Sequence, residues 1–213
     1  MGMDEKKAYW DSRYSKEGKI WGDTPSKSAQ YALKLFKKYR INTILVPGSG
    51  YGRHTKFFSN LNYEVTGIEL SPVAFNIAKK FDLISRFIND SVITNDSLGN
   101  KFDAIFCFNL LHLFLQQKRK KFLRNSYNQL HAKGYIFFTV FSEEEHTLGK
   151  GKMIEEYTFE SKTGRPTHYF TKDDLINQFH EFSVIEEGLI EEPEDHGERG
   201  SHSHILRYLF AEK

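Results

Sequence analysis

The sequence has a single cysteine, Cys107, which excludes an internal disulfide and makes a reducing cytoplasm the simplest setting. No apolar run approaches the roughly 20 residues of a membrane span, and the start, MGMDEKK, is not a secretory signal. Neither sign of charge dominates, since 30 Lys and Arg stand against 28 Asp and Glu. Nucleic-acid binders usually concentrate basic residues on one face, so we expect neither a nucleic-acid nor a membrane partner.

The chain also lacks internal repeats and any low-complexity linker. At 213 residues it is expected to form one domain, 1–213, that buries roughly 70% of its unfolded surface. An aromatic content of 15% suits a well-filled core and a lined pocket. We expect residues 1–40 to form an N-terminal helical cap and residues 142–170 a lid-like insertion. Monomer and homodimer are both left open.

Alternating apolar and amphipathic segments predict a mainly parallel sheet with helices on both faces and one antiparallel strand. Ser26 is a plausible N-cap for a helix over Ser28–Tyr39. The long polar stretch from Ser142 to His168 is either disordered or a functional lid. Near the C-terminus, we expect Glu191–Ser203 to connect the last two strands. The seven expected strands lie at or begin near 43–46, 65–69, 87–88, 102, 135–141, 182–190 and 204–212.

The most informative stretch is Ile44–Glu69, ILVPGSGYGRHTKFFSNLNYEVTGIE. An apolar strand pattern leads into alternating glycines, Gly48, Gly50 and Gly52, and a helical pattern and a second apolar run follow. Glycine lacks a Cβ and tolerates positive φ, so backbone and ligand can approach closely. The first amides of the helix leave partial positive charge at the turn. Because a carboxylate at Glu69 can accept two hydrogen bonds from a ribose, this stretch predicts a site for an adenosine-bearing ligand.

These motifs resemble the class I S-adenosylmethionine-dependent methyltransferases. The GxGxG spacing fits that family, whereas nicotinamide enzymes use GxGxxG and this chain has Arg53 where their third glycine would fall. FDAIFCFNLLHLF resembles the family's fourth-strand motif, and LHAKGYIFFTVF resembles its turn and fifth strand. LVPGSGYGR, WGDTPS and GYIFFTVFS are similar to the small stand-alone branch near the tellurite-resistance and thiol methyltransferases. The resemblance implies a Rossmann-like, doubly wound α/β fold, a seven-stranded mostly parallel sheet with an antiparallel C-terminal strand, and S-adenosylmethionine as cofactor.

The chain departs from the family two positions before the first glycine, where most members carry an acid and this chain has Val46. That acid normally helps to organise the methionine end of the cofactor. We therefore expect backbone groups of Gly48 and Gly50, together with the aromatic N-terminal segment, to hold that end. A similar "VPG" form occurs in the thiol methyltransferase branch.

The resemblance also implies roles for individual residues. Glu69 would hold the ribose, and Asp90 the adenine amino group, with the Ser91 or Val92 amide on the ring nitrogens; alternatively, Asp90 is a turn residue or helix cap. Asn109, at the end of the fourth strand, would contact the methionine moiety or the substrate. Tyr14 and Trp21 would cover the cofactor or simply attach the N-terminal helix. The full predicted cofactor set is Tyr14, Trp21, Gly48, Ser49, Gly50, Gly52, Arg53, Glu69, Leu70, Asp90, Ser91 and Asn109.

Histidines are the candidates for proton chemistry on the substrate side. His112, three residues after Asn109, is either catalytic or structural. His202 is the second catalytic candidate and lies with His196, His204 and Glu198 in a nine-residue stretch. That stretch could bind a metal, act as a base, contact an anion or be a solvated loop, and His146 has a similar open role. The ligand pattern is not that of a recognised zinc site, so we predict no metal. Cys107 is expected to pack in the core.

The resulting hypothesis is in-line methyl transfer to a small-molecule nucleophile, such as a thiol or a metalloid oxyanion. A general base is needed only if the nucleophile arrives protonated. One alternative is a protein or RNA methyltransferase, supported by the basic run Lys118-Arg119-Lys120-Lys121. Another is a protein that binds S-adenosylmethionine without catalysis.

Overall fold

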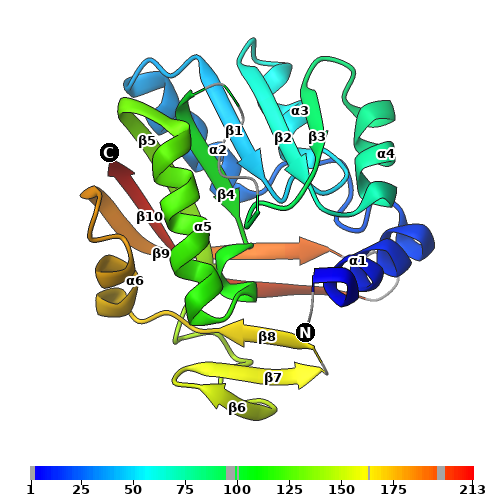
Figure 1. Ribbon diagram of the computed structural model, residues 1–213, viewed down its shortest axis with the longest axis vertical. Coiled ribbons are helices and arrows are strands. Elements are labelled where there is room, and N and C mark those ends of the chain that lie inside the picture. Colours follow the sequence, from blue (N-terminus) through cyan, green and yellow to red (C-terminus); the bar gives the residue numbers. More distant parts are fainter. Residues whose placement is uncertain (1–2, 95–98, 100, 163, 196–199) are drawn as a thin grey trace.

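A seven-stranded sheet forms the centre of the computed structural model, with strand order β3-β2-β1-β4-β5-β10-β9 (Figure 1). The structure describes residues 3–94, 99, 101–162, 164–195 and 200–213. Its helices are α1 (Met3–Glu17), α2 (Lys27–Lys38), α3 (Arg53–Ser59), α4 (Pro72–Phe81), the 3-10 turn η1 (Leu111–Leu113), α5 (Gln116–Gln129) and α6 (Lys172–Gln178). Its strands are β1 (Thr43–Pro47), β2 (Glu64–Glu69), β3 (Arg86–Asn89), β4 (Phe102–Phe108), β5 (Leu130–Phe141), β6 (Lys152–Glu155), β7 (Thr158–Lys162), β8 (Arg165–His168), β9 (Ser183–Asp195) and β10 (Ser201–Glu212).

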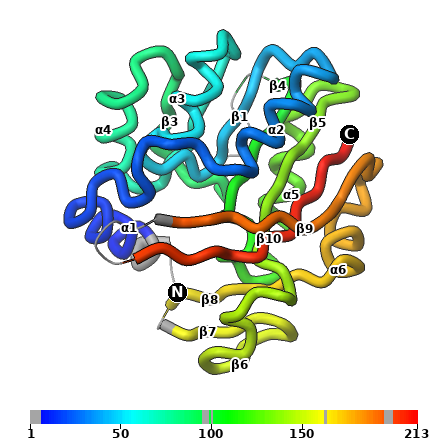
Figure 2. The backbone as a smooth tube through the Cα atoms, turned by 180° about the vertical axis from the view of Figure 1, so that it is seen from behind, coloured from blue at the N-terminus to red at the C-terminus, as the bar shows by residue number. Residues whose placement is uncertain are grey.

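The strand directions confirm the predicted mostly parallel sheet. β1 is parallel to β2 and β4, and β4 is parallel to β5. β10 is antiparallel to both of its neighbours, β5 and β9, so β9 runs in the same direction as β5. Helix α5 covers one face of the sheet in Figure 1, and α2 covers the other face, which is seen in Figure 2. The carboxyl ends of β1, β2, β3 and β4 consequently meet at one edge, which is where open α/β sheets place ligands.

Two apolar cores flank the sheet because successive side chains of a strand point to opposite faces. In β1, Leu45 belongs to the core under α5 and α6, while Ile44 and Val46 belong to the core under α2 and α3. Cys107 is fully buried in the first of these cores. The interpretation of Cys107 as a core residue is thereby confirmed.

The last two strands form the predicted hairpin, but they are longer than predicted, so the bounds Glu191–Ser203 expected for their connection are wrong. β9 continues to Asp195 and β10 begins at Ser201. Glu192 explains part of this difference: it is 1% exposed, and its carboxylate accepts hydrogen bonds from the backbone amides of Lys27 and Ser28 at 2.8 and 2.9 Å. The start of α2 thus holds an acidic strand residue whose polarity suggested a loop.

The β9–β10 hairpin also projects beyond the sheet. Pairing of β10 with β5 begins only at Leu206, whereas its pairing with β9 begins at Ser201. Residues 201–205 and their partners on β9 therefore form a two-stranded ribbon, called the C-terminal ribbon below. It lies on the side of the sheet where α1 packs in both views (Figures 1 and 2).

The polar stretch after β5 contains a small antiparallel sheet, β6-β7-β8, where we had expected disorder or a lid. The buried His168 explains much of why this stretch folds into a sheet. The His168 ring bonds to Thr158 Oγ1 and to Asp174 Oδ2, both at 2.7 Å, and so connects the small sheet to α6. A lid role for residues 142–170, and the division of the single domain, stay predictions.

The basic run on α5 does not form one exposed patch. Arg119 is 3% exposed, and its Nη1 donates a hydrogen bond to the Phe114 carbonyl at 2.8 Å. Its guanidinium also lies 3.6 Å from Glu155. This arrangement removes the central charge of the pattern that supported a nucleic-acid substrate. In the part of the chain that the structure describes, no helix has the length and apolar character needed to span a membrane.

Candidate active site

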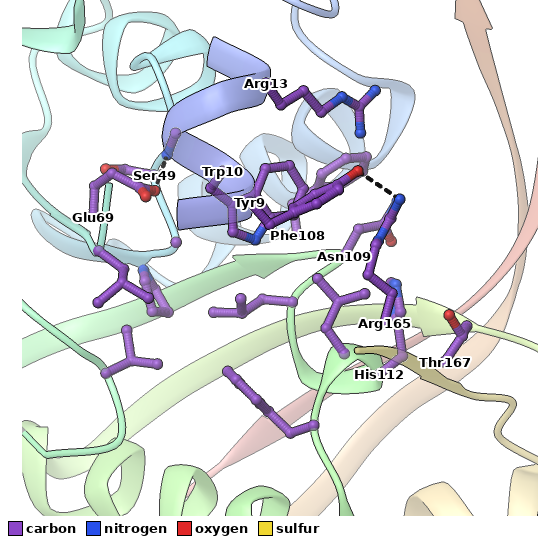
Figure 3. Close-up of a pocket in the computed structure, with 18 of the residues that line it drawn as sticks. Tyr9, Trp10, Arg13, Ser49, Glu69, Phe108, Asn109, His112, Arg165 and Thr167 are labelled. Carbon is purple, nitrogen blue, oxygen red and sulfur yellow. Dashed lines mark hydrogen bonds between the residues drawn. The ribbon is translucent and has the colours of Figure 1, made fainter. Parts of the chain in front are cut away.

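A cavity of about 520 Å³ lies at the carboxyl ends of the parallel strands, within the range typical of small-molecule sites. Its walls come from α1, the glycine turn after β1, the ends of β2 and β4, the turn η1, β8 and the C-terminal ribbon. Among the predicted cofactor residues, those that line the cavity are Tyr14, Trp21, Gly48, Ser49, Gly50, Arg53, Glu69, Leu70, Asp90, Ser91 and Asn109. Figure 3 shows several of them pointing into this space.

The glycine turn adopts a backbone that other residues would resist. Gly48 and Gly50 have φ values of 66° and 57°. A Cβ on Gly50 would lie 2.7 Å from the Tyr14 hydroxyl, closer than real Cβ contacts allow. Gly52, by contrast, is not among the lining residues: it precedes α3 as its N-cap with φ 91°, and its Cα faces Ala78. The first two glycines therefore shape the cavity, and Gly52 serves the start of the helix.

Glu69 is buried at the end of β2, with 7% of its surface exposed. Its two carboxylate oxygens accept hydrogen bonds from the backbone amides of Gly50 and Ser71, at 2.8 and 2.7 Å. Burial raises the pKa of the Glu69 carboxyl to about 6, although these amide bonds favour the charged form. Each oxygen has a second lone pair, so the carboxylate can still accept hydroxyl groups of a ribose.

Asp90 and Ser91 follow β3, at the side of the cavity that the adenine would occupy. The Ser91 amide donates to Asp90 Oδ1 at 2.6 Å, a turn bond of the kind that the alternative interpretation of Asp90 predicts. Asp90 is nevertheless exposed at the cavity wall. Beside it, Val92, Ile93 and Leu110 offer apolar contacts for a flat ring.

The predicted methionine end of the cavity is basic and aromatic. The Arg13 and Arg53 guanidiniums lie 5.3 and 5.9 Å from the Trp21 ring centroid. In the described residues, the Ser49 hydroxyl is buried and has no hydrogen-bond partner. Guanidinium and hydroxyl donors of this kind suit the carboxylate of an amino acid. Sequence reasoning missed Arg13, although it stands three residues after Trp10 on the same helix face.

Tyr14 and Trp21 both line the cavity and pack the N-terminal helix. Tyr14 is 4% exposed. The pKa of its hydroxyl is raised, mainly by burial and in addition by the nearby charge of Glu69. The Trp21 ring stacks on Tyr51 with centroids 6.3 Å apart. The two interpretations offered for these aromatic residues are therefore compatible.

Asn109 sits at the sharp exit from β4 with φ 51°, a left-handed conformation that asparagine tolerates better than most residues. Its backbone N–H donates to the Thr139 hydroxyl, and that hydroxyl donates to the side-chain Oδ1 of Asn109, both at 3.1 Å. Thr139 thereby holds the Asn109 side chain at the cavity wall between the two halves of the site.

Residues 44–134 match a family model described as a methyltransferase domain. Residues 44–134 thus match a methyltransferase domain, and the sheet around them has the class I fold. No curated protein sequence matches it.

Solved structures match the fold of this methyltransferase along nearly its whole length. One, from work on the conversion of a disulfide bond into a thioacetal group during echinomycin biosynthesis, has 17% identity and a TM-score of 0.77, covering 98% of this chain and 92% of that one. The Burkholderia thailandensis 1,6-didemethyltoxoflavin-N1-methyltransferase, with bound S-adenosylhomocysteine, has 20% identity and a TM-score of 0.70, covering 100% and 91%. TehB from Haemophilus influenzae has 13% identity and a TM-score of 0.66, covering 96% and 67%.

The residues that line the cavity fit S-adenosylmethionine, the cofactor expected of a class I methyltransferase. Gly50, whose missing Cβ leaves room for the Tyr14 hydroxyl, lets α1 pack against the glycine turn at the cavity wall. Glu69 would hold the ribose, Asp90 and Ser91 the adenine edge, and Ser49 with Arg13 the amino-acid end. The cofactor supplies a methyl group on an activated sulfonium.

On the acceptor side of the methyltransferase, two histidines stack on one aromatic ring. His112 is 3% exposed and lies parallel to Phe141, with centroids 4.3 Å apart. His204 stacks on the same Phe141 ring at 4.7 Å. Both histidines and His202 line the cavity. The structure thus brings the two catalytic candidates, His112 and His202, to one end of the site.

The environment of the ribbon histidines is anionic. His204 Nδ1 is 3.1 Å from Glu145 Oε1, and its Nε2 is 3.8 Å from Glu194 Oε2. Burial lowers the pKa of His204, but the hydrogen bond to Glu145 and the charge of Glu194 outweigh it and raise the pKa. His146 pairs with Glu145 and does not line the cavity. His196 and Glu198 lie outside the described residues.

Arg165, on β8 of the insertion, lines the cavity and contacts α1. Its Nη1 donates a hydrogen bond of 2.7 Å to the Tyr9 hydroxyl on α1, and its guanidinium lies 4.8 Å from the Tyr9 ring centroid (Figure 3). No pattern in the sequence pairs these residues, which are 156 positions apart. Arg165 was therefore missed, because only the folded small sheet carries it to the cavity.

Proposed function

We propose that this methyltransferase transfers a methyl group to a compact small-molecule nucleophile, such as a thiol, a metalloid oxyanion or a similar acceptor. The observation that carries the proposal is the contact between Arg165 of β8 and Tyr9 of α1. These two residues come from opposite walls of the cavity and meet beside its acceptor end. Because this contact bridges two walls of the cavity, it leaves less room for a segment of protein or RNA than for a small molecule.

The residues of the chain mainly position the reactants. Asn109 and Phe141 form the floor between the cofactor end and the acceptor end, and their side chains are fixed by Thr139 and by ring stacking. Enclosure by aromatic side chains excludes water and strengthens the electrostatic interactions inside. His112 and His202 are the candidates to accept a proton from an acceptor that arrives protonated. An acceptor that is already an anion needs no such base.

The test measures both cofactor binding and product. S-adenosylmethionine and S-adenosylhomocysteine are titrated calorimetrically, and S-adenosylhomocysteine formation is then followed with sulfide, small thiols, selenite, tellurite, small amines, total RNA and unfolded protein as acceptors. We expect cofactor binding, and turnover with at least one small nucleophile. His112→Ala should lower that turnover without changing cofactor affinity, while His180→Ala, an exposed histidine beyond α6, should change neither.

Methylation of RNA or protein in the absence of any small-molecule product would contradict the proposal. So would cofactor binding combined with no product from any acceptor in the panel. The result of this test does not depend on whether the protein is a monomer or a dimer. Light scattering on the same sample measures that state.

A further inference from the structure

The C-terminal ribbon places a carboxylate and two imidazoles at one point of the cavity wall. One ligand atom from each of Glu194, His202 and His204 lies within 4.8 Å of the others. The Nε2 atoms of His202 and His204 are 3.0 Å apart, and His204 Nε2 is 3.8 Å from Glu194 Oε2. Neighbouring ligands of an ion bound at about 2.1 Å are separated by roughly 3 to 3.5 Å, so small side-chain rotations would complete the set.

Strand geometry explains why these three residues meet. His202 and His204 are two positions apart on β10, so their side chains point to the same face. Glu194 is the direct cross-strand partner of His202 on β9. Directly opposed residues on antiparallel strands have Cβ atoms about 5 Å apart, close enough for both side chains to bind one ion.

Two further contacts hold the candidate ligands in a productive orientation. Glu145, whose side chain is fully buried, accepts from the Ile205 amide at 2.9 Å and lies 3.1 Å from His204 Nδ1. With its Nδ1 proton directed to Glu145, His204 presents an Nε2 lone pair towards His202 and Glu194. The Trp21 indole donates to Glu194 Oε2 at 3.1 Å. Metal-binding histidines usually have such a carboxylate partner on the second ring nitrogen, whereas a solvated loop has no need of one.

We propose that Glu194, His202 and His204 bind one divalent transition metal, for which zinc is the first candidate, at the acceptor end of the cavity. Two imidazoles and one carboxylate form a ligand set that suits zinc and leaves a coordination position open. This inference rests on the proposed function, since it assigns the open position to the methyl acceptor. The acceptor class is thereby narrowed to molecules with a metal-coordinating donor atom, above all thiols.

The proposed ion accounts for the loss of the proton from an acceptor that arrives protonated. A thiol that coordinates the ion releases its proton to solvent and keeps the sulfur lone pair. That lone pair forms the new bond to the methyl carbon, and the electrons of the broken carbon–sulfur bond stay with the departing thioether. His204 and His112 stack on the same Phe141 ring, so an acceptor on the ion would lie in the part of the cavity that His112 also lines.

The experiment titrates chelator-treated full-length protein with zinc or cobalt alone, by calorimetry and by the visible absorption of bound cobalt. We expect one ion per chain. His202→Ala, His204→Ala and Glu194→Gln should each weaken binding by about 100-fold or more, and Glu145→Gln by roughly 10- to 100-fold. His180→Ala is the matched control and should bind as the wild type does. His202 is exposed, so its variant keeps the test valid if loss of His204, which contacts the buried Glu145 carboxylate, unfolds the chain.

The outcomes separate this inference from the proposed function. Absence of binding, or binding that His202→Ala and Glu194→Gln leave unchanged, overturns the metal site. If small-molecule methylation then persists after chelation, the proposed function stands and only the metal is refuted. If the ion binds at these residues but small thiols are not methylated, the metal site stands and its assignment to the acceptor is wrong.

Discussion

Replacement of Glu69 by glutamine separates the role of this carboxylate in binding from its role in folding. In the folded chain, the Glu69 oxygens accept the Gly50 and Ser71 amides. Glutamine can accept only one of them, which costs about 1.5–3 kcal/mol for a hydrogen bond to a charged acceptor. Against this, a pKa raised from 4.5 to about 6 means that the buried charge itself costs about 2 kcal/mol.

The two contributions nearly cancel, so we expect the free energy of unfolding of Glu69→Gln at about pH 8 to lie within about 1 kcal/mol of wild type. Affinity for S-adenosylmethionine should nevertheless fall by roughly 10- to 100-fold, because a charged acceptor for the ribose hydroxyls is lost. Calorimetric titration measures the affinity and urea unfolding the stability. Glu64→Gln, at the exposed start of the same strand, is the control and should alter neither.

The pH dependence has a definite sign. The raised pKa of Glu69 favours the folded state below pH 4.5, and this contribution is lost as the pH rises through about 6. Wild type should therefore lose about 2 kcal/mol relative to Glu69→Gln between these limits. Affinity of wild type for the cofactor should fall below pH 6, while that of Glu69→Gln stays flat. Unchanged affinity in the variant, or a loss of affinity matched by an equal loss of stability, would refute the assignment of Glu69 to the ribose.

Three further outcomes are expected. Gly50→Ala should reduce cofactor affinity by at least roughly tenfold in calorimetry, because its Cβ would meet the Tyr14 hydroxyl and its φ is positive; wild-type affinity would contradict the cavity shape. Glu192→Ala should lower the free energy of unfolding by about 2–4 kcal/mol in urea, since it leaves the Ser28 amide and hydroxyl without their buried acceptor; a change below about 0.5 kcal/mol would argue against that contact. Asn109→Gly should keep stability within about 1 kcal/mol but lower turnover, whereas Asn109→Ala should lose about 1 kcal/mol more in unfolding experiments.

The cofactor half of the site was predictable because its signals are local. The glycine turn, the end of β2 at Glu69 and the end of β3 at Asp90 each follow directly from a strand pattern, and parallel strands bring such ends to one edge. The left-handed backbone that Gly48 and Gly50 adopt is the property that distinguishes glycine from other residues. The assignment to class I methyltransferases followed from the same segments, within the region that the family model matches.

Parts of the fold and of the acceptor half depend on contacts between distant segments, which residue patterns do not encode. The charge of Glu192 suggested a loop, yet the start of α2, about 165 positions earlier, provides its hydrogen-bond donors. Likewise, Arg119 looked like one member of a basic surface but is buried against Phe114 and Glu155. Glu145 carries no sequence signal at all, and only the packing of the loop after β5 places it beside His204.

The C-terminal ribbon has a consequence for how such a site can diversify. Before Leu206, β10 does not pair with β5, and in the described residues the ribbon is held by β9 and by lateral contacts such as the one from Glu145 to the Ile205 amide. Lengthening both strands by two residues each would move the acceptor-facing side chains outward yet leave them on the same face, whereas a single residue would turn them away. The depth of the acceptor chamber can therefore change in steps of two residues, while the sheet and the cofactor end stay as they are.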